Sequence, residues 1–117
     1  GFNGTQRLPK CIGMNKAKEI LFTGKMLTAA DALELGILNH VTEPEQLMDE
    51  VYAMAGQIAD NSASAISLVK AAVNAGADMD IDIGKNIELG YMAACFGTPD
   101  QIEGFASFKE KRAAKFR

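Results

Sequence analysis

Residues 43–58 read Glu43-Pro44-Glu45-Gln46-Leu47-Met48-Asp49-Glu50-Val51-Tyr52-Ala53-Met54-Ala55-Gly56-Gln57-Ile58 and carry the clearest structural signal in the chain. The apolar residues recur at three- and four-residue steps: Leu47, Met48, Val51, Met54, Ala55 and Ile58. That spacing places them on one face of a helix. The stretch also opens with a proline at the first helical position and acidic side chains in the first turn. It therefore predicts an amphipathic helix.

Helix signals of the same kind recur on both sides of this stretch. Upstream, Thr28 and the three residues after it have the form of a capping box. Downstream, Ser62, Asp80 and Thr98 can each cap a further helix with a side-chain oxygen. Residues 37–41 differ, because their branched side chains and partial alternation predict a brief extended segment. The sequence therefore predicts an all-α, multi-helix fold with at most that one extended segment.

The N-terminal stretch reads Gly1-Phe2-Asn3-Gly4-Thr5-Gln6-Arg7-Leu8-Pro9-Lys10. Its glycines permit backbone conformations that other residues avoid. We expect Thr5 to cap a short helix over residues 5–12, which Pro9 can enter only in the first turn. The free N–H groups there suit an anion, a carbonyl or a water, although an ordinary turn explains the composition equally well. With no initiator Met, we expect the chain to be a piece of a longer protein.

Composition narrows the class of protein. The chain has 117 residues, 48% hydrophobic and 23% charged, which is typical of one globular domain. A formal net charge of −3 argues against a nucleic-acid-binding protein, which is usually strongly basic. No apolar run is long enough for a membrane span, and no secretory signal opens the chain, so we expect neither nucleic acid nor membrane as a partner.

The cysteines and the single histidine do not predict a metal site. Cys11 and Cys95 lie far apart among apolar neighbours, which favours buried free thiols over a disulfide, although a disulfide stays open. His40 has no nucleophile or carboxylate spaced to use it, and no paired cysteines accompany it. The alternating aspartates of residues 78–82 lack the glycine and distal glutamate of a calcium loop, so helix capping explains them better.

The C-terminal tail is locally basic. Residues 109–117 carry five cations and one acid, on a chain that is acidic as a whole. One interpretation is a solvated helix end whose cations complement the helix dipole. The other is a site for a phosphorylated ligand, with Phe108 or Phe116 offering a face to a purine ring. Both remain open at this point.

Several ordered blocks together resemble one family. These are Gly1–Pro9, Leu21-Phe22-Thr23-Gly24, Leu35-Gly36-Ile37-Leu38-Asn39, Asn61-Ser62, Gly97-Thr98-Pro99-Asp100, and Glu103-Gly104-Phe105 with the following Glu110-Lys111-Arg112. In order and separation they resemble the C-terminal portion of the crotonase superfamily, most closely the enoyl-CoA hydratases. The resemblance covers essentially the whole chain.

The resemblance implies a parent enzyme that adds water to a trans-2-enoyl-CoA. Two glutamates serve such enzymes as general base and acid, and two backbone N–H groups stabilise an enolate-like oxyanion. In the family pattern all of these lie N-terminal to the glycine that matches Gly1. The isolated chain is therefore expected to be inactive. The acyl-CoA thioester is the substrate, and no separate cofactor is implied.

Three positions can be carried over from the family pattern. Gly1 matches a glycine whose N–H lies beside the catalytic water, although at a chain terminus that N–H becomes an ammonium. Phe108 and Lys111 match an aromatic and a basic position that approach the adenine end of CoA, often from a neighbouring subunit. They are the expected CoA-binding residues of this chain.

The resemblance also bears on organisation and setting. It implies a single helical C-terminal domain over residues 1–117, in which residues 1–24 join the missing catalytic core and residues 25–117 form a helical array. Such domains build trimers that commonly stack in pairs, in enzymes of fatty-acid β-oxidation in the bacterial cytoplasm or mitochondrial matrix. Two alternatives remain open: another crotonase activity, such as an enoyl-CoA isomerase or other acyl-CoA lyase, and a non-catalytic helical oligomerisation module.

Overall fold

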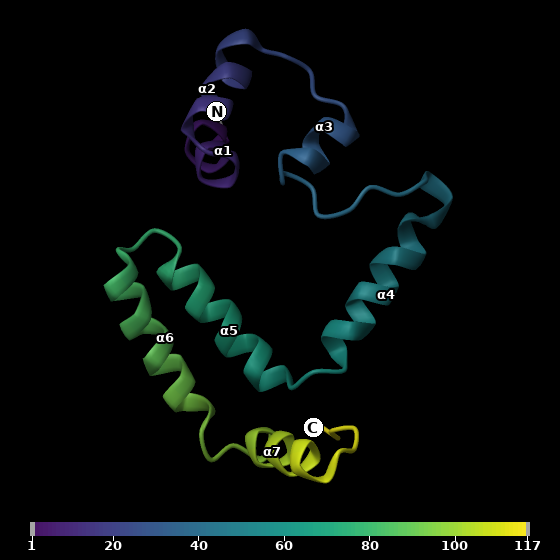
Figure 1. The fold of residues 1–117 in the computed structure, drawn as a ribbon, viewed down its shortest axis with the longest axis vertical. Helices are drawn as coiled ribbons and strands as arrows, with labels where there is room; N and C mark the ends of the chain where they lie inside the picture. Colours follow the sequence, from purple (N-terminus) through teal and green to yellow (C-terminus); the bar gives the residue numbers. More distant parts are fainter. Residues whose placement is uncertain (1, 117) are drawn as a thin grey trace. The chain divides into compact units, whose positions relative to one another are not determined.

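The computed structural model describes residues 2–116, and every regular element within them is helical (Figure 1). In chain order the elements are α1 (Gly4–Ile12), α2 (Met14–Thr23), α3 (Ala29–Glu34), the 3-10 helix η1 (Pro44–Gln46), α4 (Leu47–Ala59), α5 (Ala63–Gly76), α6 (Ile81–Cys95) and α7 (Pro99–Glu110). The predicted all-α fold is confirmed. The chain divides between Met48 and Asp49 into two compact units, the N-terminal unit (residues 2–48) and the C-terminal unit (residues 49–116).

In the N-terminal unit, α1 and α2 pack against each other across a single glycine. Gly13 has a φ of 81°, which a residue with a side chain rarely adopts, and it separates the two helices. Ala17 of α2 is fully buried. A small side chain at this position lets neighbouring backbone approach closely, so the pair depends on the absence of bulk there.

The start of α1 differs from the prediction. The N-cap is Asn3, in the left-handed region with a φ of 64°, and no side chain caps the helix. Two N–H groups of the first turn donate instead to the Asn3 carbonyl oxygen, at 2.9 and 3.0 Å. The expectation that Thr5 caps this helix was wrong, because backbone groups already start it one residue earlier. Pro9 lies beyond the first turn, so the expectation that it enters only there was wrong. The helix continues past it, and the Gly13 N–H donates to the Pro9 carbonyl at 2.9 Å.

The predicted capping box at the start of α3 is confirmed. The Asp31 N–H donates to the Thr28 hydroxyl oxygen at 3.1 Å, and the Thr28 N–H donates to the Asp31 carboxylate at 3.0 Å. These hydrogen bonds favour the ionised carboxylate, so the Thr28 backbone N–H and then its hydroxyl lower the pKa of Asp31.

The end of α3 includes the first residues of the segment that was expected to be extended over residues 37–41. Gly36 has a φ of 75°, and its N–H donates to the Leu33 carbonyl at 3.0 Å. The Ile37 N–H donates to the Ala32 carbonyl at 2.8 Å, which completes a Schellman motif. The segment is therefore irregular and begins by closing the preceding helix, and no strand forms within residues 2–116.

In the C-terminal unit, α5 and α6 lie side by side as a hairpin (Figure 1). The three predicted caps are confirmed. Ser62, Asp80 and Thr98 each accept a hydrogen bond from a backbone N–H in the first turn of α5, α6 and α7, at 2.9–3.2 Å. Each cap satisfies a donor that a helix start would otherwise leave unpaired.

The last turn of α7 carries Lys109, and the rest of the basic tail follows the end of the helix. The helix stops at Glu110, and Lys111 takes the left-handed conformation with a φ of 54°. The Arg112 N–H donates back to the Ser107 carbonyl at 3.1 Å, which closes the last turn. Residues 111–116 therefore leave the helix direction instead of extending it.

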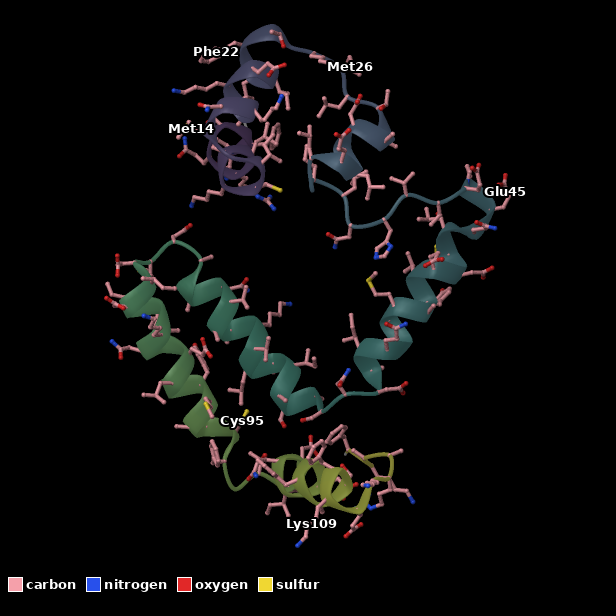
Figure 2. All side chains as sticks on the ribbon, viewed as in Figure 1. Met14, Phe22, Met26, Glu45, Cys95 and Lys109 are labelled. Carbon is pink, nitrogen blue, oxygen red and sulfur yellow. The ribbon has the colours of Figure 1, made fainter. Side chains whose placement is uncertain are left out.

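Large apolar side chains stay exposed in both units. Phe22 and Met26 are mostly exposed in the N-terminal unit (Figure 2). On α4 the exposed set comprises Leu47, Met48, Val51, Tyr52, Met54 and Ile58. Both cysteines are free thiols, but the expected burial was wrong, because Cys11 is exposed and Cys95 only half-buried. The chain's own packing thus covers little of its apolar stripes.

Candidate functional site

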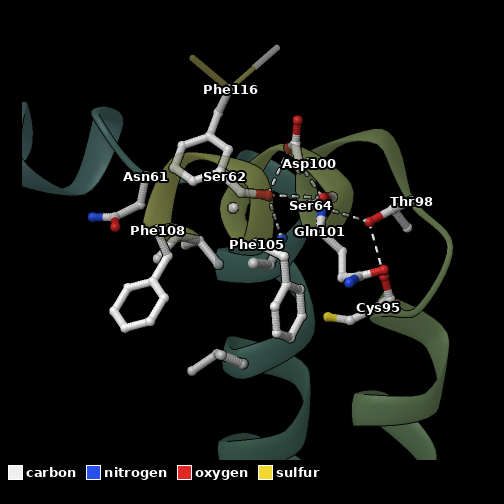
Figure 3. Close-up of a pocket in the computed structure, with 14 residues that line it drawn as sticks. Asn61, Ser62, Ser64, Cys95, Thr98, Asp100, Gln101, Phe105, Phe108 and Phe116 are labelled. Carbon is white, nitrogen blue, oxygen red and sulfur yellow. Dashed lines mark hydrogen bonds between the residues drawn. The ribbon is translucent and has the colours of Figure 1, made fainter. Parts of the chain in front are cut away.

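The C-terminal unit contains an apolar pocket of about 430 Å³ (Figure 3). It is lined from the start of α5, the end of α6, the length of α7 and the tail. Three phenylalanines contribute aromatic walls: Phe105 and Phe108 from α7, and Phe116 from the tail. We call it the aromatic pocket. Its size and lining suit a flat or apolar group.

A buried polar cluster also lines the aromatic pocket. The Ser62 hydroxyl donates to Oδ2 of Asp100 at 2.6 Å, and the Ser64 hydroxyl donates to the same oxygen at 3.3 Å (Figure 3). Ser62 is 5% exposed and Asp100 8%. A carboxylate this buried needs hydrogen-bond donors to offset its lost hydration. The cluster therefore joins the starts of α5 and α7, elements that are 38 positions apart.

The tail is held by a second polar cluster. The guanidinium of Arg112 donates to both carboxylate oxygens of Glu103, at 2.6 and 2.9 Å. The Lys115 N–H donates to Oε1 of Glu103 at 2.7 Å, and Arg112 Nε donates to Glu110 at 2.6 Å. The hydrogen bonds from Arg112, and next that from Lys115, lower the pKa of Glu103 to about 2. The same carboxylates raise the pKa of Arg112.

This second cluster determines where the tail lies relative to α7. Phe116 follows Lys115 directly, and its ring lies beside Gly104, the residue after Glu103. A Cβ placed on Gly104 would lie 3.8 Å from Cε1 of Phe116. The ring therefore lies over a position that has no side chain and leaves room there for no more than a methyl group in ordinary contact.

The pocket has the means to bind but no acid–base pair. Asp100 is the one carboxylate among the described residues that line it, and serine hydroxyls already occupy Oδ2. General acid–base catalysis needs a titratable group within reach of a reacting atom. The geometry therefore favours holding a planar or apolar part of a ligand.

The structure describes two of the three residues expected at the site. Gly1 lies outside the described residues. Phe108 lines the aromatic pocket with 86% of its surface exposed. Lys111 is exposed at the end of α7 but is not among the lining residues, because its left-handed backbone takes it off the helix.

Sequence reasoning missed both polar clusters. It recognised Ser62 as a cap but not as a partner of Asp100, and it did not pair Glu103 with Arg112. Separations of 38 and nine positions match no helical repeat, so neither pair leaves a periodic signal. The run of cations in the tail, opposite one partly buried acid of α7, was the available hint.

Within residues 2–116, no three His, Cys, Asp or Glu side chains gather in a way that could hold a metal ion. His40 is exposed in the irregular segment after α3. In the same range, no helix combines the length and apolar character that crossing a membrane requires.

Comparison with known proteins finds the same family in sequence and in structure. The family model described as enoyl-CoA hydratase/isomerase matches residues 1–117. A crotonyl-CoA hydratase of Syntrophomonas wolfei is 44% identical over 99% of this chain and 45% of its own length. A mitochondrial enoyl-CoA hydratase domain-containing protein 2 of Mus musculus is 42% identical over 99% of this chain and 40% of its own.

A solved structure extends the similarity to the arrangement of the helices. The crystal structure of an enoyl-CoA hydratase from Bacillus anthracis superposes with a TM-score of 0.94 at 35% identity. The match covers 99% of this chain and 45% of that one. The chain thus spans a little under half the length of these relatives.

Proposed function

This chain belongs to the enoyl-CoA hydratase/isomerase family, and we propose on that basis that the protein carrying it is an enoyl-CoA hydratase-like lyase. The reaction is the addition of water to the double bond of a trans-2-enoyl-CoA. One observation carries the proposal: a crotonyl-CoA hydratase is 44% identical across 99% of the chain. Similarity this even along the chain favours a shared role over a shared motif.

The chain is the C-terminal support and assembly part of that enzyme. It spans about 45% of the hydratases to which it is similar. Its aromatic pocket offers no pair of carboxylates for acid–base work on a water molecule. The catalytic glutamates then belong to the remainder of the protein, and the isolated chain is inactive, because binding without them leaves the chemical step unassisted.

Within that enzyme, Phe108 and Lys111 bind the CoA end of the substrate. The largely exposed ring of Phe108 offers a face on which an adenine can stack. Lys111 is an exposed cation three residues later, which suits a phosphate of the same ligand. The acyl group, where the chemistry occurs, lies outside this chain.

The uncovered apolar faces support a homo-oligomer, a trimer or a dimer of trimers. Apolar side chains along α4 stay exposed in the chain by itself. Soluble proteins seldom leave such faces uncovered. Subunit contacts and the remainder of the protein would cover them. The setting is β-oxidation in a bacterial cytoplasm or a mitochondrial matrix, which agrees with bacterial and mitochondrial relatives.

The test is turnover of crotonyl-CoA by the complete protein, followed by loss of enoyl-thioester absorbance and identification of the product. A 3-hydroxyacyl-CoA product is expected. A product with a migrated double bond would favour the isomerase, and no turnover of any enoyl-CoA would favour the oligomerisation module. Sizing of the isolated chain tests its share in assembly, and a strict monomer would count against trimer formation by this part alone.

A further inference from the structure

We propose that Glu103 is a positioning residue that holds the tail strap, residues 111–116, against α7 so that Phe116 forms one wall of the aromatic pocket. Glu103 itself does not line the aromatic pocket and acts through Phe116. The identity of the ligand, the CoA end of the substrate, rests on the proposed function. The strap itself rests on the geometry of the C-terminal unit.

The first step is the convergence of three donors on one carboxylate. Two come from the fork of Arg112 and one from the Lys115 backbone, all at 2.6–2.9 Å. A bidentate guanidinium–carboxylate pair fixes orientation as well as distance, which a single contact between point charges does not. The pair therefore fixes the course of the strap at two places, Arg112 and Lys115.

The second step is that the tail strap reverses direction at Lys111, where the backbone conformation is unfavourable. Lys111 has a φ of 54° and carries a side chain, so its left-handed conformation is less favourable than that of a glycine. Chain ends also tend to fray unless they are tied down. The reversal after α7 therefore needs an external hold, and Glu103 supplies it.

The third step connects the hold to the pocket. Phe116 is adjacent to the anchored Lys115, and its ring lies over Gly104, where a Cβ would be 3.8 Å from Cε1. The same ring lines the aromatic pocket with Phe108 (Figure 3). Release of the strap would remove one wall and leave the two phenylalanines of α7 in place.

The experiment compares Glu103→Gln with a matched control, Glu110→Gln, in the complete protein. Glu110 also accepts a hydrogen bond from Arg112 but none from the Lys115 backbone, so its loss leaves the strap anchored. Amide exchange of the strap is measured first. We expect Glu103→Gln to raise the exchange rate at Lys115 about tenfold, and the control to raise it less than about twofold.

Binding is measured next with coenzyme A as the probe, by titration calorimetry. Glu103→Gln should raise the dissociation constant about three- to tenfold, and Phe116→Ala should raise it by a similar factor. The double variant should bind no more weakly than Phe116→Ala alone, because both changes remove the same wall. With crotonyl-CoA as substrate, KM should rise while kcat stays within about twofold.

Three outcomes overturn the strap: unchanged exchange at Lys115 in Glu103→Gln, coenzyme A affinity unchanged in Phe116→Ala, or a fall in kcat with affinity intact. Arg112→Lys gives a second variant, which loses the bidentate fork and should repeat the effect more weakly. Failure of the proposed function looks different. If the complete protein does not hydrate crotonyl-CoA but still binds coenzyme A more weakly in Glu103→Gln, the proposal for the strap stands. Only the proposed reaction is then wrong.

Discussion

The two units hold their helices in place by different means. In the N-terminal unit the contacts are a glycine between α1 and α2, a buried Ala17 and a capping box on α3. One longer-range contact is a hydrogen bond from the Cys11 thiol of α1 to the Gly36 carbonyl after α3, at 3.4 Å. In the C-terminal unit, two carboxylates join different segments of the chain. Asp100 joins α7 to the start of α5, and Glu103 joins α7 to the tail.

The two kinds of contact differ in whether they can order a surface whose apolar side chains are still exposed. Local packing and caps shape single helices and helix pairs, but they cover few apolar side chains, and Phe22 stays exposed. Buried polar clusters can order a surface before its apolar faces are covered, because hydrogen bonds are directional and apolar contact is not. In the C-terminal unit, such hydrogen bonds lie beside the aromatic pocket. Four experiments test this contrast.

Removal of the buried carboxylate should give the largest effect. Asp100→Ala should lower the free energy of unfolding by about 2–3 kcal/mol, because hydrogen bonds to a charged group are lost and the Ser62 hydroxyl loses its acceptor. Urea unfolding followed by circular dichroism measures it. Asp82→Ala is the matched control, since Asp82 is also the second residue of a helix but its side chain is 80% exposed. Equal losses in the two variants would show that the cluster adds nothing beyond a favourable charge at a helix start.

Added bulk in the N-terminal unit should come next. Ala17→Leu should destabilise the protein by about 2 kcal/mol, because a fully buried position has no room for three more carbons. The loss appears as a lower midpoint of thermal unfolding. Ala30→Leu, at an exposed alanine of α3, is the control and should change the midpoint little. A tolerated Ala17→Leu would mean that α1 and α2 pack less closely than the structure indicates.

Loss of a single cap should have a smaller effect. Thr28→Ala removes the oxygen that accepts the Asp31 N–H and should cost about 1 kcal/mol. Amide exchange in residues 29–34 should quicken, while exchange in α7 stays as it was. Thr42→Ala provides the comparison, because the Thr42 hydroxyl bonds only a neighbouring carbonyl. Quickened exchange in the control as well would assign the change to threonine loss in general.

Acid should have the most local effect. The pKa of Glu103 is about 2 in the folded chain against 4.5 ordinarily, so its contribution is complete above about pH 4.5. It is lost as the pH falls through about 2, because the protonated carboxyl no longer attracts Arg112 or accepts fully from the Lys115 N–H. Carboxyl titration by NMR, with strap exchange at each pH, checks it. A Glu103 that titrates near 4.5 would contradict the anchored strap.

Helix starts were predictable because their chemistry is local. Ser62, Asp80 and Thr98 each cap the helix that the residues after them predict. The wrong prediction of the cap of α1 also came from considering only side-chain oxygens. Asn3 acts through its left-handed backbone and not through its side chain, whereas the prediction considered only the Thr5 hydroxyl.

The candidate site was predictable only in part. Phe108 and Phe116 were recognised as possible aromatic faces, and both line the aromatic pocket. The segment at residues 37–41 differs from the prediction at its start, where the first N–H groups close α3. The course of the tail after α7 was not predicted, because cations counted along a sequence do not indicate that Arg112 will meet Glu103.

By itself the sequence determined the all-helical class, the places where most helices begin, and the family. These depend on side-chain periodicity and on hydrogen bonds that span three or four residues. Both can be recognised directly in the sequence. Only the tertiary structure decided that Asp100 meets Ser62, that Glu103 holds the strap, and that Phe116 closes the pocket wall. Those pairings depend on how separate segments lie in space. A hydrogen bond between them produces no periodic pattern in the sequence.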